Sequence, residues 1–186
     1  MNINDSELFG RKADTIKINV ENSKELIERG LKYFFGEKAA WLPEYDQIKD
    51  WLINNNGKGL LCIGDGGRGK TFITEKILSP IISKFYCHLN VHFVRGYSMA
   101  EDYESGTGTI LIIDDVGVER EQNVFGEKKN TFNQIVYEAE RYGWLLIVTT
   151  NLTIEELKDK YGERTLDRLR ALTTPVVFRG KSLRNR

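Results

Sequence analysis

Apolar residues along the chain fall into short continuous runs that are separated by segments with helical spacing. Five runs rich in Leu, Ile and Val have the length of a strand, at residues 60–63, 91–95, 109–113, 145–149 and 175–178. Strands of a parallel sheet are apolar throughout because helices cover both faces of the sheet. Helical periodicity between the runs predicts helices near 71–84, 129–142 and 153–160. The alternation predicts an α/β fold: a five-stranded parallel sheet with helices on both faces.

Two further helical patterns precede the first of these strands. Over residues 23–35 the spacing predicts a short amphipathic helix with apolar positions at Leu26, Ile27, Leu31, Phe34 and Phe35. Pro43 opens a second helical segment that runs to Ile53. The first pattern is too short to form a domain of its own.

Composition is that of an ordinary globular protein of one domain, with 186 residues, 40% hydrophobic and 29% charged. No apolar stretch approaches the ~20 residues of a membrane span. The start is polar and acidic, unlike a signal peptide. These features predict a cytoplasmic protein. Cys62 and Cys87 do not have the spacing of a metal site, and His88 and His92 fall on different elements, so we expect no metal site there.

The segment directly after the first strand carries the pattern G-x-x-x-x-G-K-[ST], which is typical of a loop that binds nucleoside triphosphates. Glycines let the backbone turn its N–H groups towards phosphate oxygens, and the following helix adds its positive end. Lysine would reach the β- and γ-phosphates, and threonine would bind Mg²⁺. A Gly-rich turn formed by chance is the alternative. The candidate residues of this phosphate loop are Gly64, Asp65, Gly66, Gly67, Arg68, Gly69, Lys70 and Thr71.

Two adjacent carboxylates follow the run at 109–113. An acidic residue at the carboxyl end of a buried parallel strand lies beside the phosphate loop, so the run is typical of a Walker B strand. Asp114 is placed to hold Mg²⁺, and Asp115 is the candidate for polarising the attacking water. A helix N-cap is the alternative role for Asp115. Because two neighbouring carboxylates repel each other without a cation between them, we favour the catalytic role.

The strand at 145–149 also ends in short polar side chains, Thr150 and Asn151. An amide here would reach between the Walker B acid and the γ-phosphate, where it would orient water and sense hydrolysis. The alternative is that Asn151 caps the next helix. Thr153 is the better N-cap because Glu155 and Glu156 follow in the first turn, which leaves Asn151 free.

Residues 162–170 predict a helix with arginines on several sides. An arginine inserted into a neighbouring subunit's nucleotide site stabilises charge on the transferring phosphoryl group. Arg168 is the first candidate, and Arg164, four residues earlier, lies on nearly the same face. Either residue would act while the other pairs with an acid. The alternative is that both are surface arginines paired with local acids such as Glu163 and Asp167.

The chain as a whole has no basic excess, with 27 basic and 27 acidic residues. From residue 162 onwards, however, seven basic residues face two acidic ones, a net charge of plus five. A basic end favours a nucleic-acid or partner contact, and a solvated terminus is the alternative.

Taken together, the motifs W-L-P-E-Y-D, G-D-G-G-R-G-K-T, L-I-I-D-D-V-G, T-T-N, G-E-R-T-L-D-R-L-R and G-K-S-L-R resemble the DnaC/IstB-like branch of AAA+ ATPases. The resemblance covers about Trp41 to Arg184 and preserves the motif order. It implies an N-terminal extension over 1–40 and an AAA+ ATPase core over 41–186, with the lid absent or reduced. It also implies ATP as the nucleotide, Trp41 near the adenine and Arg168 at the arginine-finger position, with Arg164 beside it.

The resemblance implies a helicase-loader-like or transposition-helper-like ATPase in DNA replication or mobile-element DNA transactions. We expect ATP and Mg²⁺ as ligands, self-association through the trans-acting arginine, and contact with single-stranded DNA and a helicase or transposase. Asp115 stands where many relatives have glutamate, so we expect weak hydrolysis until the protein assembles or meets a partner. One alternative is an ATP-gated module that recruits a partner through the helix at 23–35 without hydrolysis. Another is a small-molecule kinase.

Overall fold

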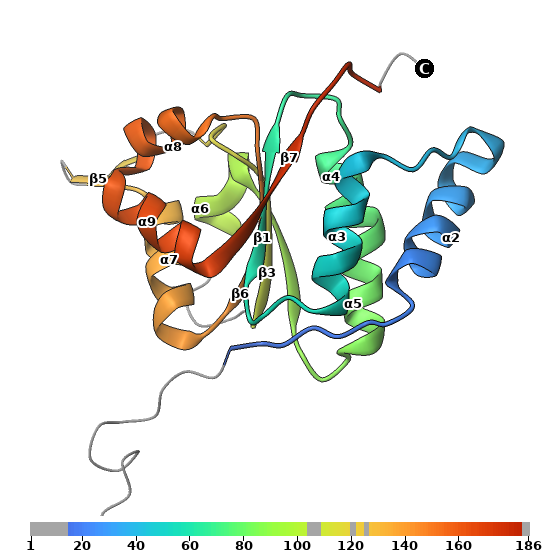
Figure 1. The fold of residues 1–186 in the computed structure, drawn as a ribbon. Coiled ribbons are helices and arrows are strands. Elements are labelled where there is room, and N and C mark those ends of the chain that lie inside the picture. Colours follow the sequence, from blue (N-terminus) through green and yellow to red (C-terminus); the bar gives the residue numbers. More distant parts are fainter. Residues whose placement is uncertain (1–14, 104–108, 120–121, 125–126, 184–186) are drawn as a thin grey trace, which may run out of the picture.

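The computed structural model describes residues 15–103, 109–119, 122–124 and 127–183. Its central element is a five-stranded, all-parallel sheet in the order β2-β3-β6-β1-β7 (Figure 1). The strands are β1 (Gly59–Gly64), β2 (Val91–Arg95), β3 (Ile110–Val116), β6 (Leu145–Thr150) and β7 (Thr173–Phe178). All five predicted strands are present, and the α/β fold with a parallel sheet is confirmed.

Helices cover both faces of the sheet (Figure 1). One face carries α2 (Ser23–Phe35), α3 (Pro43–Ile53) and the continuous helical stretch α4 (Lys70–Phe72), η2 (Ile73–Leu78) and α5 (Ser79–Phe85). The other carries α6 (Met99–Asp102), α7 (Thr131–Tyr142), α8 (Ile154–Tyr161) and α9 (Glu163–Leu172). Short elements complete the described chain: η1 (Gly36–Lys38), η3 (Gly96–Ser98) and the hairpin of β4 (Gln122–Val124) and β5 (Glu127–Lys129).

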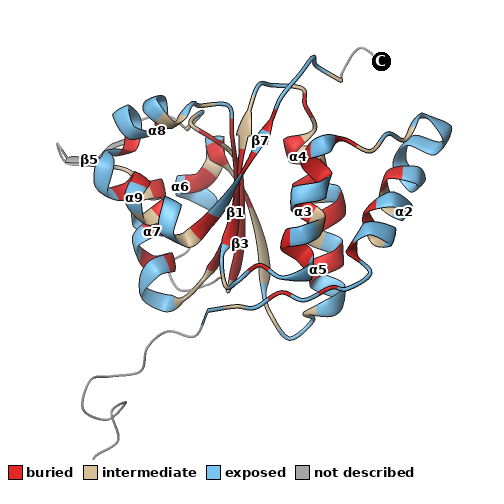
Figure 2. Cartoon of the chain, viewed as in Figure 1, coloured by how far each residue is buried: buried red, intermediate tan, exposed pale blue. Residues whose placement is uncertain are grey.

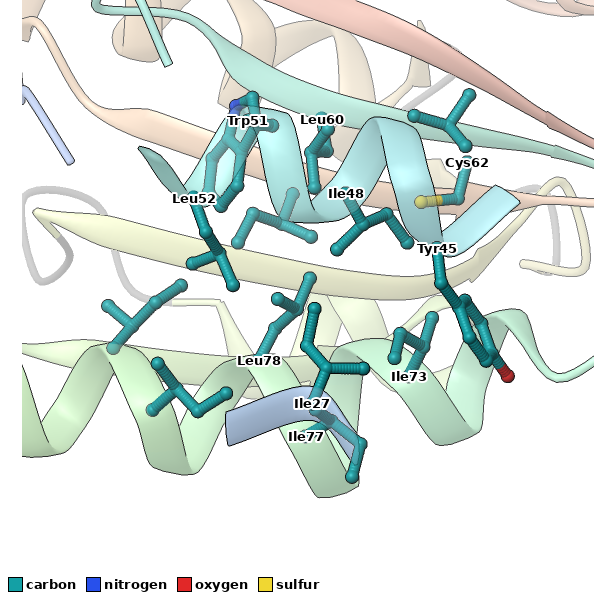
Figure 3. Close-up of a cluster of buried hydrophobic side chains, with 14 of the residues drawn as sticks. Ile27, Tyr45, Ile48, Trp51, Leu52, Leu60, Cys62, Ile73, Ile77 and Leu78 are labelled. Carbon is teal, nitrogen blue, oxygen red and sulfur yellow. The ribbon is translucent and has the colours of Figure 1, made fainter. Parts of the chain in front are cut away.

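Each face of the sheet has its own hydrophobic core, and the buried positions follow the inward sides of the helices (Figure 2). The core under α3 and α5 packs Ile48, Leu52 and Leu78 against sheet residues such as Leu60 (Figure 3). The core under α7 and α9 joins Phe132 and Leu169 to Leu146 and Val148. Two cores separated by one sheet explain why the central strands are apolar at every position.

The described part of the N-terminal extension packs onto the first core. Ile27 and Leu31 of α2 are buried there, as are Ile18 and Val20 in the segment that precedes the helix. Gly30 allows the close approach of the helices, because a Cβ at this position would lie 2.5 Å from the Cδ1 atom of Ile77. The extension therefore shares a hydrophobic core with the rest of the fold.

Local geometry departs from the expected elements in two places. The helix after the phosphate loop contains a π-helical stretch over Ile73–Leu78, where the Thr74 hydroxyl donates to the carbonyl oxygen of Lys70 at 3.0 Å. Strand β3 runs three residues beyond the predicted end, to Val116, and its register with β6 shifts between Ile113 and Val116. Within the described residues, no helix is long and apolar enough to cross a membrane.

Candidate functional site

The phosphate loop lies between β1 and α4, at the carboxyl edge of the sheet. Gly67 and Gly69 adopt positive φ angles of 80° and 91°, which L side chains rarely reach. The N–H groups of Gly66, Gly67 and Gly69 donate to no protein acceptor in the described part of the chain. Free amide donors in a glycine bend fit the oxygens of a polyphosphate.

Lys70 is buried at the centre of this bend, with 6% of its surface exposed. Its ammonium donates to the carbonyl oxygens of Gly64 at 2.6 Å and Asp65 at 2.9 Å, and to the Asn151 Oδ1 atom at 2.7 Å. Burial lowers the pKa of Lys70, an effect that nearby carboxylates, first Asp115, oppose. The ammonium is therefore desolvated and positioned for an anionic ligand.

The two carboxylates near the end of β3 point in different directions. Asp114 is 4% exposed, and its Oδ1 atom accepts a hydrogen bond from the Thr149 hydroxyl at 2.8 Å. Asp115 has a positive φ of 61°, and its backbone N–H donates to the same Thr149 hydroxyl at 2.8 Å. The bulge in β3 turns the Asp115 side chain to the cavity described below, where it accepts from the Asn151 Nδ2 atom at 2.7 Å.

Asn151 thus joins the phosphate loop to the Walker B carboxylate. Thr153, not Asn151, caps α8: its side chain accepts from the Glu156 N–H, and the Glu156 side chain accepts from the Thr153 N–H. The expectation that Thr153 would leave Asn151 free for another contact is confirmed. Its role as a γ-phosphate sensor stays a prediction.

A cavity of about 530 Å³ opens beside these residues, a volume that suits a nucleotide. Its polar part is lined by Lys70, Thr71, Glu75, Asp115, Thr149 and Asn151. Its apolar part is lined by Leu31, Phe35, Ala40, Leu42, Tyr45 and Leu183. The lining thus offers both charged groups and apolar surface to a ligand.

Four residues predicted at the nucleotide or its Mg²⁺ have side chains that do not line this cavity: Trp41, Asp65, Arg68 and Asp114. Trp41 packs at right angles to Tyr45 with 5.8 Å between ring centroids, while its neighbours Ala40 and Leu42 reach the cavity. Arg68 is buried and ion-paired with Glu44 at 3.1 Å. The predicted contact of Trp41 with adenine stays a prediction. The predicted contact of Arg68 with phosphate also stays a prediction, and it would involve the backbone N–H of Arg68 because the side chain is paired with Glu44.

The Arg68–Glu44 pair also anchors the segment that follows β7. The Glu44 Oε1 atom accepts from the Arg179 N–H at 2.9 Å, and the Leu183 N–H donates to the carbonyl oxygen of Gly67 at 2.8 Å. These contacts hold Leu183 against the phosphate loop, where it lines the cavity. The C-terminal segment is therefore part of the site, which hydrophobic periodicity does not reveal.

The candidate arginine fingers lie on α9, across the sheet from α4 (Figure 1). Arg168 donates through Nε to Glu140 at 2.6 Å and lies 5.3 Å from the centroid of the Tyr137 ring. Arg164 is exposed and has no ion pair within the described ranges. Neither side chain lines the cavity of its own chain. If either acts at a nucleotide, it is at that of another subunit.

Sequence reasoning missed Arg95 and Glu75. Arg95 ends β2 and donates to the Asp114 Oδ2 atom at 2.9 Å and the Glu75 Oε2 atom at 2.8 Å. The position of Arg95 at the end of a predicted strand was a signal that could have found it. Parallel strands end at the same edge of a sheet, so a charged residue there lies near the ends of the neighbouring strands.

The predicted Mg²⁺ ligands Thr71 and Asp114 fit a cation that is held mainly by phosphate oxygens. Among the described residues, no cluster of three or more His, Cys, Asp or Glu side chains forms a metal site by itself. Both residues stay predicted ligands.

No protein-family model and no curated protein sequence matches the chain. Several solved structures match it in fold. The crystal structure of the DnaC helicase loader matches with a TM-score of 0.51 and 18% identity, over 91% of this chain and 94% of that one. DnaI matches with a TM-score of 0.51 and 19% identity, over 68% and 73%. AMPPCP-bound DnaA from Aquifex aeolicus matches with a TM-score of 0.52 and 19% identity, over 72% and 45%. At these identities the likeness concerns the fold.

Proposed function

Because the chain has the AAA+ P-loop fold of the DnaC-like proteins, we propose that it binds ATP with Mg²⁺ and hydrolyses the ATP. The observation that carries the proposal is the chain of hydrogen bonds from Lys70 through Asn151 to Asp115, three residues that line the cavity. These three side chains come from three separate parts of the sequence. Their convergence next to free phosphate-loop amides favours phosphoryl chemistry.

Each residue has a defined task in this proposal. Residues 64–71 hold the triphosphate through backbone N–H groups, and Lys70 supplies the fixed positive charge. Thr71 and Asp114 would hold Mg²⁺, which neutralises charge on the β- and γ-phosphates when bound. Asp115 accepts a hydrogen bond from the attacking water, and Asn151 keeps the Asp115 carboxylate and that water in line with the γ-phosphate.

Assembly completes the proposed site. The arginines of α9 lie outside the cavity of their own chain, so Arg168 or Arg164 would stabilise the phosphoryl group of a neighbouring subunit. In this structure Arg168 is paired with Glu140. Insertion of Arg168 would require release of that pair, whereas Arg164 is already exposed. We therefore expect weak ATPase activity from the isolated chain.

We further propose that the protein acts in DNA replication or in mobile-element DNA transactions, as a helicase-loader-like or transposition-helper-like ATPase. The fold likeness to DnaC, DnaI and DnaA supports this assignment. The partners in this proposal are a helicase or transposase and single-stranded DNA. Of the basic end that favours a DNA contact, Arg184 and Arg186 lie outside the described residues.

A second candidate function is an ATP-gated binding module with negligible hydrolysis. The end of α2 exposes three aromatic side chains: Tyr33 (83% exposed), Phe34 (46%) and Phe35 (48%). Phe34 and Phe35 both contact Phe72, the residue after Thr71, with ring centroids 5.4 and 4.8 Å apart. Phe35 and Phe72 also line the cavity, so a bound nucleotide would touch the surface that recruits a partner.

Two measurements test these functions. Calorimetric titration with a non-hydrolysable ATP analogue should show Mg²⁺-dependent binding that is lost in Lys70→Ala and kept in Lys84→Ala, which removes an exposed lysine on α5. Absence of Mg²⁺-dependent binding by the wild type would refute both functions. Single-turnover hydrolysis with single-stranded DNA then separates the two functions. Hydrolysis that DNA stimulates supports the ATPase, and no detectable hydrolysis at any protein concentration supports the binding module.

A further inference from the structure

Arg95 contacts the carboxylate of Asp114, the predicted Mg²⁺ ligand at the end of the Walker B run. Strands β2 and β3 are parallel with Arg95 opposite Asp114 in register, so the arginine lies beside this carboxylate because of the sheet pairing itself. Its Nη1 atom donates to Asp114 Oδ2 at 2.9 Å, and Thr149 donates to Asp114 Oδ1. Both oxygens of the predicted Mg²⁺ ligand therefore already have partners from the protein.

Arg95 also connects Asp114 to a residue of the cavity wall. Neither residue lines the cavity, whereas Thr71 and Glu75 do. Glu75 follows Thr71 by four residues on the same helical stretch, and it accepts from the Arg95 Nη2 atom at 2.8 Å. One guanidinium thus bridges a buried carboxylate and a carboxylate at the cavity wall. The fork geometry of arginine suits such a bridge.

We propose that Arg95 is an internal counter-ion that competes with Mg²⁺ for Asp114, and that Glu75 retains the guanidinium when the metal is bound. The inference rests on the proposed function, in which Asp114 is a Mg²⁺ ligand. A Mg²⁺ ion approaches its oxygen ligands to ~2.1 Å. A guanidinium on the same oxygen would repel it, so Arg95 must leave Asp114 for Mg²⁺ to bind there.

The surroundings of Arg95 allow that movement. The side chain is 36% exposed, and its guanidinium lies 4.7 Å from the centroid of the Phe93 ring, which stabilises a cation without a hydrogen bond. Glu75 remains as a partner at the cavity wall. Without nucleotide, Arg95 neutralises Asp114 and Mg²⁺ binds weakly. With nucleotide, the phosphates would add ligands for Mg²⁺, and the more tightly held cation would compete with Arg95 for Asp114. Metal binding is thereby made dependent on nucleotide binding.

Lys76 offers a matched control. Its ammonium contacts the other carboxylate oxygen of Glu75 at 2.7 Å, and it forms no ion pair with Asp114 among the described residues. Arg95→Gln and Lys76→Gln therefore remove one positive charge each from the same group of side chains, and only the first frees Asp114. A general electrostatic effect would act in both variants.

The experiment measures Mn²⁺, as a spectroscopic substitute for Mg²⁺, bound to the full chain without nucleotide by electron paramagnetic resonance. Arg95→Gln should bind Mn²⁺ about tenfold more tightly than the wild type, because a carboxylate has lost its competing cation. Lys76→Gln should change the affinity less than about twofold, and Arg95→Gln combined with Asp114→Asn should lose the gain. Equal affinities in Arg95→Gln and the wild type, or equal gains in both single variants, would overturn the proposal.

Arg95→Lys provides the same test if Arg95→Gln fails to fold. A single ammonium cannot bridge Asp114 and Glu75 as the guanidinium does, so we expect Mn²⁺ affinity above that of the wild type. Affinity at or below the wild-type value would count against the proposal. Nucleotide binding by the wild type is measured separately. Failure of ATP to bind refutes the proposed function, while the Mn²⁺ titration decides the role of Arg95.

Discussion

The Lys70 ammonium donates a hydrogen bond to the Asn151 side-chain oxygen across 2.7 Å, although 81 residues separate the two in the chain. The contact joins the phosphate loop to the residue that follows β6. A movement of Lys70 on phosphate binding or hydrolysis would therefore change the hydrogen bond of the Asn151 amide. The other end of that amide holds Asp115.

Substitution of Asn151 by alanine should reduce turnover much more than nucleotide affinity. The change removes the group that orients Asp115 and leaves the phosphate loop and Lys70 in place. We expect kcat to fall by ~10²-fold, in the range for loss of a group that positions a general base. Steady-state hydrolysis and calorimetric titration measure the two effects. Thr153→Ala, which removes the α8 cap two residues away, is the control. Equal losses of affinity and turnover would argue against the assignment.

Separate alanine variants of Arg168 and Arg164 should show which arginine acts in trans. An arginine finger contributes only in assembled protein, so wild-type specific activity should rise with protein concentration, and the rise should vanish in the finger variant. ATP affinity should stay unchanged in both. ATPase rate measured against concentration is the readout, with Arg170→Ala as a control for charge on α9. Unchanged turnover in Arg168→Ala at all concentrations would remove that residue from the role.

Arg68→Ala should destabilise the fold strongly, because it leaves the Glu44 carboxylate buried without its partner. Breaking one side of a buried ion pair costs about 3 kcal/mol in the free energy of unfolding. The double variant Glu44→Leu, Arg68→Met should lose less, since no buried charge remains. Urea unfolding monitored by circular dichroism gives both values. A loss in Arg68→Ala no larger than that of an exposed variant such as Lys84→Ala would contradict the buried-pair argument.

Tyr45 should make the fold less stable at high pH. Burial, with a smaller effect of Glu44, raises the pKa of Tyr45 to about 12. Tyrosine in the unfolded chain ionises near pH 10, so ionisation favours the unfolded state as pH rises from 10 towards 12. Relative to Tyr45→Phe, the wild type should lose about 1.4 kcal/mol of unfolding free energy between pH 8 and pH 11. Urea unfolding at both pH values is the measurement. Parallel pH dependences would contradict the prediction.

The sequence alone determined the fold and the main motifs because their signals are local. Apolar runs of strand length require two covered faces, and five of them predict the parallel sheet that the structure contains. The phosphate loop is likewise readable from eight consecutive residues, since its conformation depends on its own glycines. Strand ends then placed Asp114, Asp115 and Asn151 at one edge. The choice of Thr153 as the α8 cap followed from side-chain chemistry within one helical turn.

Only the tertiary structure determined the orientation of long side chains and the residues that they contact. Periodicity could not show that Arg68 faces Glu44, that Ala40 and Leu42 rather than the Trp41 ring reach the cavity, or that Arg168 is held by Glu140. Nor could it show that a bulge rotates Asp115 away from Asp114, or that sheet order places Arg95 against the Walker B carboxylate. These features depend on contacts between residues far apart in the chain. Such contacts exist only once the sheet order and helix packing bring distant charges together.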